Sequence, residues 1–266
     1  PFGETEDVAI TILVDNRADL LDRSTATVRR FVDRPLLAEH GFAALVELKA
    51  AGVRILWDAG MTAGVLLENM ARLAISPDNI DQIALSHGHG DHTAGLTGVL
   101  KAISARPTAR TWDAGTPVAE LAAWAERRRV PVAAHPAALR ERWKVASDGK
   151  MTGPSQAPYR EWEACGARLE LSESPLRLGP GCWTTGFVPR TTFETAGIGA
   201  QLYYREGDRL LPDRLEDDQA IVINVRDKGL VVLAGCAHAG ILNTVQQAQR
   251  ISGVERVWAI IGGFHL

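Results

Sequence analysis

Three histidines and one aspartate fall within six residues, and their chemistry is that of metal ligands. The stretch reads His87-Gly88-His89-Gly90-Asp91-His92, so a glycine separates each of the first three of these residues from the next. Neutral imidazole nitrogens and a carboxylate oxygen together suit a divalent transition metal. In an extended segment His87 and His89 point to one side, and Asp91 and His92 can face a second position after the chain bends. The spacing therefore predicts two adjacent metal sites.

The segments around this histidine loop predict how it is positioned. A short buried strand over residues 80–85 leads into the loop, and residues 95–103 are expected to form a helix that begins beside the metals. Two later β-rich segments also end in glycine followed by a histidine, namely His238 and His265. The recurrence predicts that both histidines join the first cluster from the ends of their own strands.

Apolar patterning elsewhere predicts alternating strands and helices, with hairpins around Ala51-Gly52 and Arg226-Asp227-Lys228-Gly229. Residues 146–160, which contain glycines and prolines, indicate a flexible connection or lid, and residues 17–38 a loop or short helix. The expected strands cover residues 8–14, 42–48, 53–58, 130–134, 169–178, 182–187, 219–225, 229–234 and 254–261, and the further helices 61–75, 118–129 and 241–250.

Composition narrows the class of protein. A chain of 266 residues with 46% hydrophobic content can bury a sizeable core, and we expect a single domain over residues 1–266. A net charge of −3 gives no support for nucleic acid or a membrane as partner. The expected partner is a small-molecule substrate, and a homo-oligomer is compatible with the sequence. Three widely spaced cysteines favour a cytoplasmic location. A cleaved export signal stays compatible with a chain that begins at Pro1.

Two polar residues at strand ends allow more than one interpretation. Asp58 could hydrogen-bond a metal-bound histidine or cap the helix that follows it. His135, a lone histidine followed by proline, is expected to be structural.

The stretch from His87 to His92 resembles the His-x-His-x-Asp-His signature of the metallo-β-lactamase superfamily. Most of the chain is similar to the branch named after 7,8-dihydropterin-6-methyl-4-(β-D-ribofuranosyl)aminobenzene-5′-phosphate synthase. The resemblance implies an α/β fold, an αββα sandwich of two mixed sheets face to face with helices outside and a dinuclear centre at one edge. The matching stretches are Val14-Asp15-Asn16, Glu39-His40-Gly41, Asp58-Ala59-Gly60 and residues 185–190, 235–245 and 261–266.

Carried over to this chain, the resemblance makes His87 and His89 ligands of one metal and Asp91 and His92 ligands of the other. The superfamily's later histidine has no counterpart in residues 185–190, and its bridging aspartate corresponds roughly to Gly235-Cys236. His238 is expected to fill one vacancy. Cys236 could ligate as a thiolate or be a small buried residue, and the second interpretation is slightly favoured.

The end of the chain bears on the last ligand. The branch continues to a further His-Cys-Thr-Gly segment, whereas this chain ends at Leu266. Either His265 completes the site or a later segment does.

A dinuclear centre predicts a hydrolase in which two divalent ions activate a hydroxide, with zinc as the expected metal and manganese or iron as alternatives. The expected substrate is a small phosphoester, lactone or related molecule. Asp91 would be both ligand and orienter of the nucleophile, and Arg190 and His40 are further candidate catalytic residues. Two alternatives stay open: the synthase-type transfer, in which an amine displaces an activated pterin diphosphate, and a non-hydrolytic redox or sensor protein.

Overall fold

The computed structural model describes residues 2–18, 23–31, 35–104, 113–127, 129–196 and 201–264. A six-stranded sheet in the order β1-β2-β3-β4-β5-β8 forms one half of the core. Strands β1 to β3 pair antiparallel, and β3, β4, β5 and β8 pair parallel. The bounds are β1 (Val8–Val14), β2 (Ala43–Leu48), β3 (Val53–Trp57), β4 (Gln82–Ala84), β5 (Val130–Ala134) and β8 (Ala167–Leu171).

A second, five-stranded sheet faces the first and has the order β15-β14-β13-β10-β9. Its pairs are antiparallel except for β14 and β15, which are parallel, so both sheets are mixed. The bounds are β9 (Arg177–Gly179), β10 (Cys182–Thr184), β13 (Ala220–Val225), β14 (Gly229–Ala234) and β15 (Val257–Ile261). The two predicted hairpins are confirmed as β2–β3 and β13–β14.

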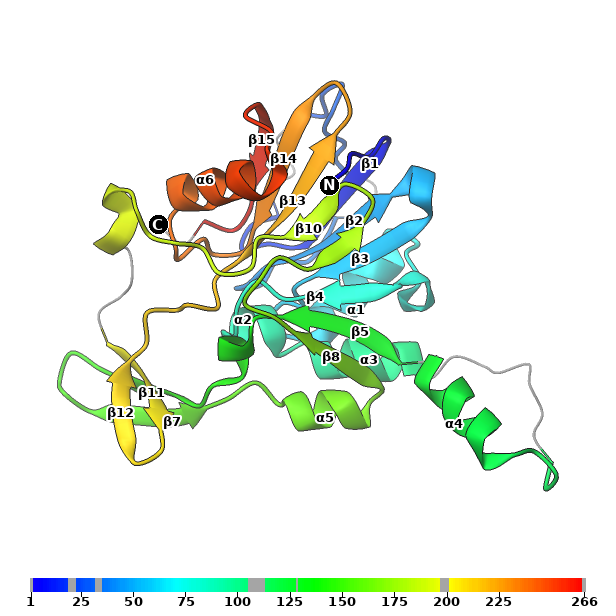
Figure 1. Cartoon of the computed structure of the whole chain (residues 1–266), viewed down its shortest axis with the longest axis horizontal. Coiled ribbons are helices and arrows are strands. Elements are labelled where there is room, and N and C mark those ends of the chain that lie inside the picture. Colours follow the sequence, from blue (N-terminus) through cyan, green and yellow to red (C-terminus); the bar gives the residue numbers. More distant parts are fainter. Residues whose placement is uncertain are drawn as a thin grey trace.

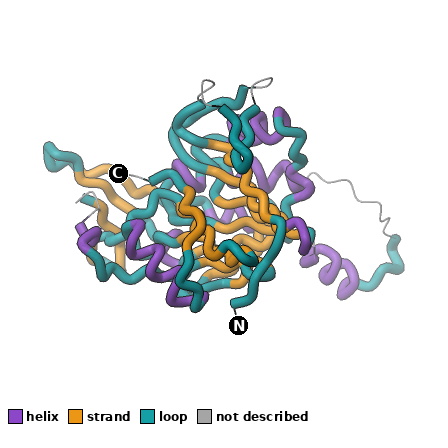
Figure 2. Tube along the Cα trace, turned by 90° about the horizontal axis from the view of Figure 1, so that it is seen from above, coloured by secondary structure: helices purple, strands orange, loops and turns teal. Residues whose placement is uncertain are grey.

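Helices cover the outer faces of both sheets (Figure 1), and the predicted αββα sandwich is confirmed. Helices α1, α3 and α5 pack on the first sheet, and α6 packs on the second; α4 stands apart from these layers at one end in both views (Figures 1 and 2). None of the described helices combines the length and apolar character that crossing a bilayer requires. The bounds are α1 (Ala63–Arg72), α2 (Gly90–Thr93), α3 (Leu96–Ser104), α4 (Val118–Arg127), α5 (Tyr159–Ala164) and α6 (Ile241–Ser252), with short 3₁₀ turns at Lys49–Ala51, Pro77–Asn79, Pro136–Leu139 and Phe193–Ala196.

The central strands are buried on both faces, which explains their nearly continuous apolar sequences. Along β3, Ile55 and Trp57 point into the layer between the sheets, while Leu56 points toward α1 and α3. The opposite sheet contributes Ile221, Ile223 and Leu233 to the layer between the sheets. This double burial holds the strand ends, and the loops that follow them, in fixed positions.

A third sheet was not predicted. Strands β6 (Arg142–Val145), β7 (Met151–Ser155), β11 (Leu202–Glu206) and β12 (Arg209–Pro212) pair antiparallel in the order β12-β11-β6-β7. This sheet extends from one end of the sandwich (Figure 1). The expected flexible connection over residues 146–160 is therefore wrong, because β7 and the start of α5 lie within it. Every residue of β7 is exposed, so no apolar alternation reveals it as a strand.

Two other predictions need correction. The expected strand over residues 169–178 is two strands, β8 in the first sheet and β9 in the second. Ser172 closes the bend between them by accepting a hydrogen bond from Ser174 N and donating one to Ser174 O. The helix expected over residues 95–103 is confirmed as α3, but the helix that begins beside the histidines is α2, one turn that contains Asp91 and His92.

Candidate metal centre

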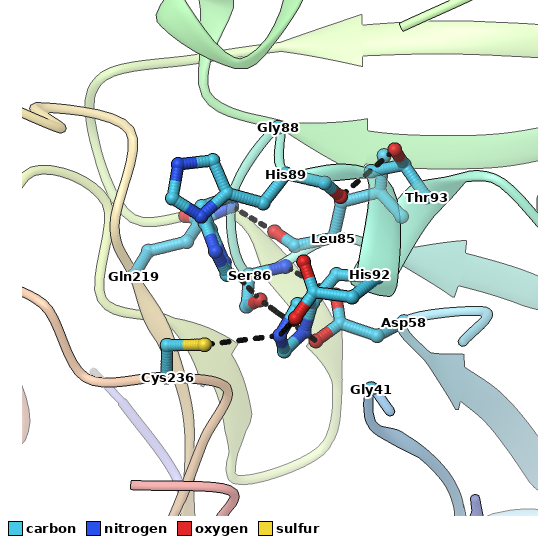
Figure 3. A network of polar contacts seen from close by, with 12 residues as sticks. Gly41, Asp58, Leu85, Ser86, Gly88, His89, His92, Thr93, Gln219 and Cys236 are labelled. Carbon is cyan, nitrogen blue, oxygen red and sulfur yellow. Dashed lines mark hydrogen bonds and ion pairs between the residues drawn. The ribbon is translucent and has the colours of Figure 1, made fainter. Parts of the chain in front are cut away.

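Asp58 is the residue around which the histidine loop is ordered (Figure 3). It follows β3 directly, is fully buried, and has a φ of 57°, a conformation that non-glycine residues adopt at a cost of about 1 kcal/mol. Its carboxylate accepts hydrogen bonds from the backbone N and Oγ of Ser86 and from Nδ1 of His92, each 2.7 Å long. Helix α1 is capped by Thr62 instead. Of the two interpretations of Asp58, the contact with a histidine is confirmed.

The same network sets the tautomer of His87. Ser86 gives its only hydroxyl proton to the Asp58 carboxylate, which can only accept when ionised. Its oxygen lies 2.8 Å from Nδ1 of His87 and therefore accepts the proton of that nitrogen. The lone pair of His87 is then on Nε2, which is buried and has no hydrogen-bond partner among the described residues. A buried acceptor without a donor is costly unless a cation occupies the position it faces.

His92 is oriented in the same way by direct contact. Because its Nδ1 proton is donated to Asp58, its Nε2 faces away from that carboxylate, 3.1 Å from Sγ of Cys236 and 3.3 Å from Oδ2 of Asp91. Burial alone would lower the pKa of His92, but Asp58, followed by Asp91 and Cys236, raises that pKa well above its usual range. The acidic groups around the His92 ring, above all Asp58 at Nδ1, therefore favour positive charge on the ring.

His238 and Cys236 approach from the other sheet, on the loop after β14. The ring centroid of His238 lies 4.9 Å from that of His87 and 5.0 Å from that of His89. The ring centroids of His87 and His89 are 4.5 Å apart. The ligand atoms of His87, Cys236 and His238 lie within 4.8 Å of one another, and so do those of Asp91, His92 and Cys236. The structure thus brings together all of the described residues that the sequence nominated as ligands.

The charges of these groups suit a cation. Burial lowers the pKa of His87 and, to a lesser degree, that of His89. Both rings are therefore neutral and can offer a nitrogen lone pair to a metal ion. Burial alone would raise the pKa of Asp91, but the hydrogen bond and charge of His92 hold it well below its usual range. Burial raises the pKa of the Cys236 thiol. Imidazole nitrogens, a carboxylate and a thiol form a donor set that fits one or two divalent metal ions.

A buried ion-pair network that the sequence did not indicate supports the loop from behind. Gly88 donates its backbone N–H to Oδ2 of Asp217, 2.7 Å away. Arg142 bridges Asp217 and Asp213 at 2.8 and 2.6 Å, and all three side chains are at most 5% exposed. A Cβ at Gly88 would lie 2.2 Å from the carbonyl oxygen of Ala138, so only glycine fits there. The signal in the sequence was limited to an acidic pair within a polar segment.

A pocket of about 230 Å³ opens on the Asp91 side of the cluster. His40 lies in it, with Nε2 at 3.5 Å from Oδ2 of Asp91. The lining residues are Asn16, His40, Gly41, Phe42, Asp91, His92, Cys236, Gly263 and Phe264. The structure therefore places His40 beside Asp91 in the pocket, and its catalytic role stays a prediction.

Three other histidine and arginine candidates remain. Arg190 donates to the carbonyl oxygen of Leu215, and within the described ranges no hydrogen bond joins it to the donor residues; its assignment as catalytic stays a prediction. His135 accepts from the backbone N of Ala137 and caps a 3₁₀ turn, which agrees with the expected structural role. His265 lies outside the described residues.

The protein is an α/β protein with two facing mixed sheets and helices on both outer faces. Imidazole, carboxylate and thiol donors gather at one edge and form a candidate metal centre. Residues 38–241 match the family model of the metallo-beta-lactamase superfamily. The chain belongs to that superfamily.

Individual relatives agree with this membership. The chain is 35% identical over 239 residues to the 7,8-dihydropterin-6-methyl-4-(beta-D-ribofuranosyl)-aminobenzene-5'-phosphate synthase of Methanocaldococcus jannaschii. The matched region covers 87% of this chain and 72% of the relative. It is 29% identical over 257 residues to an uncharacterised protein of the same organism, and this match covers 97% of this chain and 79% of the relative. A crystal structure described as a metal-dependent hydrolase of the beta-lactamase superfamily has the same fold, with a TM-score of 0.65 and 21% identity over 97% of this chain and 76% of that one.

Proposed function

We propose that this chain is a dinuclear metal-dependent hydrolase of a small phosphoester, lactone or related substrate, with zinc as its metal and manganese or iron as alternatives. The observation that supports this best is the pair of adjacent donor groups beside a pocket. His87, His89 and His238 would hold one ion, and Asp91 and His92 the other. Bound there, two divalent ions would supply Lewis-acid activation of a water molecule and of the substrate's carbonyl or phosphoryl oxygen.

The chain's own groups would orient the reaction. The side chain of Asp91 is 15% exposed and lines the pocket, so its Oδ2 can orient the attacking water and accept a proton from it. His40 is 67% exposed at the outer side of Asp91 and would contact the substrate. Phe42 and Phe264 line the same pocket and would exclude bulk water.

The test is turnover by the purified protein after its metals are restored. A panel of phosphoesters, lactones and β-lactams should include at least one substrate, and failure across the panel would reject the hydrolase. His89→Ala should abolish activity and lower the metal content. A matched control is His135→Asn, which removes an imidazole outside the cluster and keeps an oxygen for the N–H of Ala137. Full activity in His89→Ala would reject the assignment of the site.

The second candidate is a synthase-type transfer, and its support is the 35% identity to the named synthase. In that reaction an amine would displace an activated pterin diphosphate, and the cations would stabilise the diphosphate leaving group. The chain would then need a dihydropterin diphosphate and an arylamine together. Amine-dependent release of diphosphate would favour the transferase, whereas release without amine, with a hydroxylated product, would favour the hydrolase.

A further inference from the structure

We propose that Cys236 is a thiolate ligand shared by both metal positions, and this inference rests on the metal centre of the proposed function. Its Sγ belongs to both donor groups: with His87 and His238 on one side, and with Asp91 and His92 on the other. No other described residue belongs to both groups. An atom in that position contacts either ion and therefore joins them.

The spacing around the sulfur agrees with ligands of one ion. Donor atoms that bind a tetrahedral ion at about 2.0–2.3 Å lie roughly 3.5 Å from one another. Nε2 of His92 is 3.1 Å from Sγ of Cys236 and 3.3 Å from Oδ2 of Asp91. On the other side, Nε2 of His87 is a buried lone pair without a hydrogen-bond donor among the described residues, which independently marks a place for a cation.

A packing role accounts for the position of Cys236 less well than metal ligation does. The chain's other buried cysteine, Cys182, lies in the apolar layer between the sheets, with Ile221 and Ile223. Cys236 is 6% exposed and belongs to none of the hydrophobic clusters formed by the described residues. A small apolar side chain would serve at position 182, whereas the polar surroundings of Cys236 require a ligand or a hydrogen-bond partner.

The backbone holds the sulfur in this position. A Cβ at Gly235 would lie 2.2 Å from Oγ of Ser86, so no side chain fits between this part of the Cys236 loop and Ser86. The carbonyl oxygen of Gly235 accepts hydrogen bonds from the backbone N of Gly263 and of Phe264. The thiol is therefore placed by a fixed loop, and a bound cation would displace its proton to solvent.

Thiolate sulfur also narrows the choice of metal. Soft sulfur ligands select zinc and iron, whereas manganese prefers carboxylate and other oxygen ligands. A shared thiolate thus favours zinc or iron over manganese at both positions. Within the proposed hydrolase, the expected order of affinity is zinc above manganese in the intact protein, with a smaller difference once Cys236 is replaced by an oxygen ligand.

The test is stepwise loading of the chelator-treated full chain with Co²⁺, whose bond to a thiolate gives a near-ultraviolet charge-transfer band. The band should grow over both equivalents of Co²⁺ in the unaltered protein and in the control Cys165→Ser, which removes a thiol remote from the cluster. Cys236→Ser should lose the band and bind Co²⁺ at least about tenfold more weakly, the smallest loss typical of residues that only support a ligand. Cys236→Asp should lose the band and still bind two equivalents.

Each other outcome is decisive. A band that saturates at the first equivalent would overturn sharing, and two bound Co²⁺ without a band would overturn ligation by Cys236 while leaving the proposed function intact. A chain that binds no Co²⁺ would reject the proposed function together with this inference. Unchanged circular dichroism in Cys236→Ser is the check that the loss of the band does not come from unfolding.

Discussion

Replacing Asp58 with asparagine should weaken metal binding although Asp58 itself faces away from the metal positions. The carboxylate accepts from both Oγ of Ser86 and Nδ1 of His92, at 2.7 Å each, through the same atom, Oδ2. If the asparagine places its amide nitrogen there, it presents protons to both donors. His92 must then move its own proton to Nε2, where it blocks the lone pair that faces Cys236 and Asp91.

The magnitude follows from comparable supporting residues. Loss of a carboxylate that orients a metal-bound histidine typically costs ten- to hundredfold in metal affinity, or about 1.4 to 2.7 kcal/mol. Asp58 supports two histidines, His92 directly and His87 through Ser86, so the loss should affect both metal positions. Ser86→Ala removes the 2.8 Å contact with Nδ1 of His87 and only a longer contact, 3.4 Å, with Nδ1 of His92. It should therefore weaken one position more than the other.

Stepwise titration with Zn²⁺ against a competing chelator separates the two affinities. The control is Asp81→Asn, because Asp81 also accepts a backbone N–H, from Arg54 at 2.7 Å, but belongs to neither donor group. Two unchanged Zn²⁺ affinities in a folded Asp58→Asn protein would refute the reasoning that Asp58 sets the histidine tautomers. Equal losses of Zn²⁺ affinity at both positions in Ser86→Ala would refute the inference that Ser86 mainly supports His87.

Further predictions concern the scaffold behind the loop. Arg142→Met should lower the free energy of unfolding in urea by about 3–5 kcal/mol, because two carboxylates stay buried without their partner. Arg168→Met, which breaks an exposed pair, should change it by about 1 kcal/mol or less, and similar values for both would contradict this account. Gly88→Ala should lower Zn²⁺ content, because its Cβ would lie 2.2 Å from a carbonyl oxygen; Gly90→Ala, with open space around it, should not, and equal Zn²⁺ contents would refute the steric argument.

The part of the site that the sequence predicts is the part that is local. His87, His89, Asp91 and His92 lie within one loop and one helical turn, so their spacing alone places them near one another. The two hairpins were also predictable, because turn residues separate their apolar runs. The αββα layering was expected only from the resemblance to the metallo-β-lactamase superfamily. His238 was predicted from the recurrence of the same strand-end pattern rather than from any contact.

What the sequence leaves out depends on contacts between distant segments. Gly88 and Asp217 are 129 positions apart, and neither residue type indicates the other. The choice between the two interpretations of Asp58 required the position of His92, 34 residues later. Strand β7 could not be predicted because both of its faces are exposed, and apolar periodicity reports only burial.

The candidate metal centre draws its donors from the ends of both sheets, and protein contacts hold those donors in place. Ser86, on the loop after β4, meets Gly235, on the loop after β14, at a distance that admits no side chain on Gly235. Buried apolar layers on both sides of the first sheet fix the strands that deliver these loops. In small structural zinc domains, by contrast, the metal supplies the folding energy itself. Here the donors are preorganised by a large core and open onto a pocket, which is the arrangement expected where metal ions act on a substrate rather than hold a fold together.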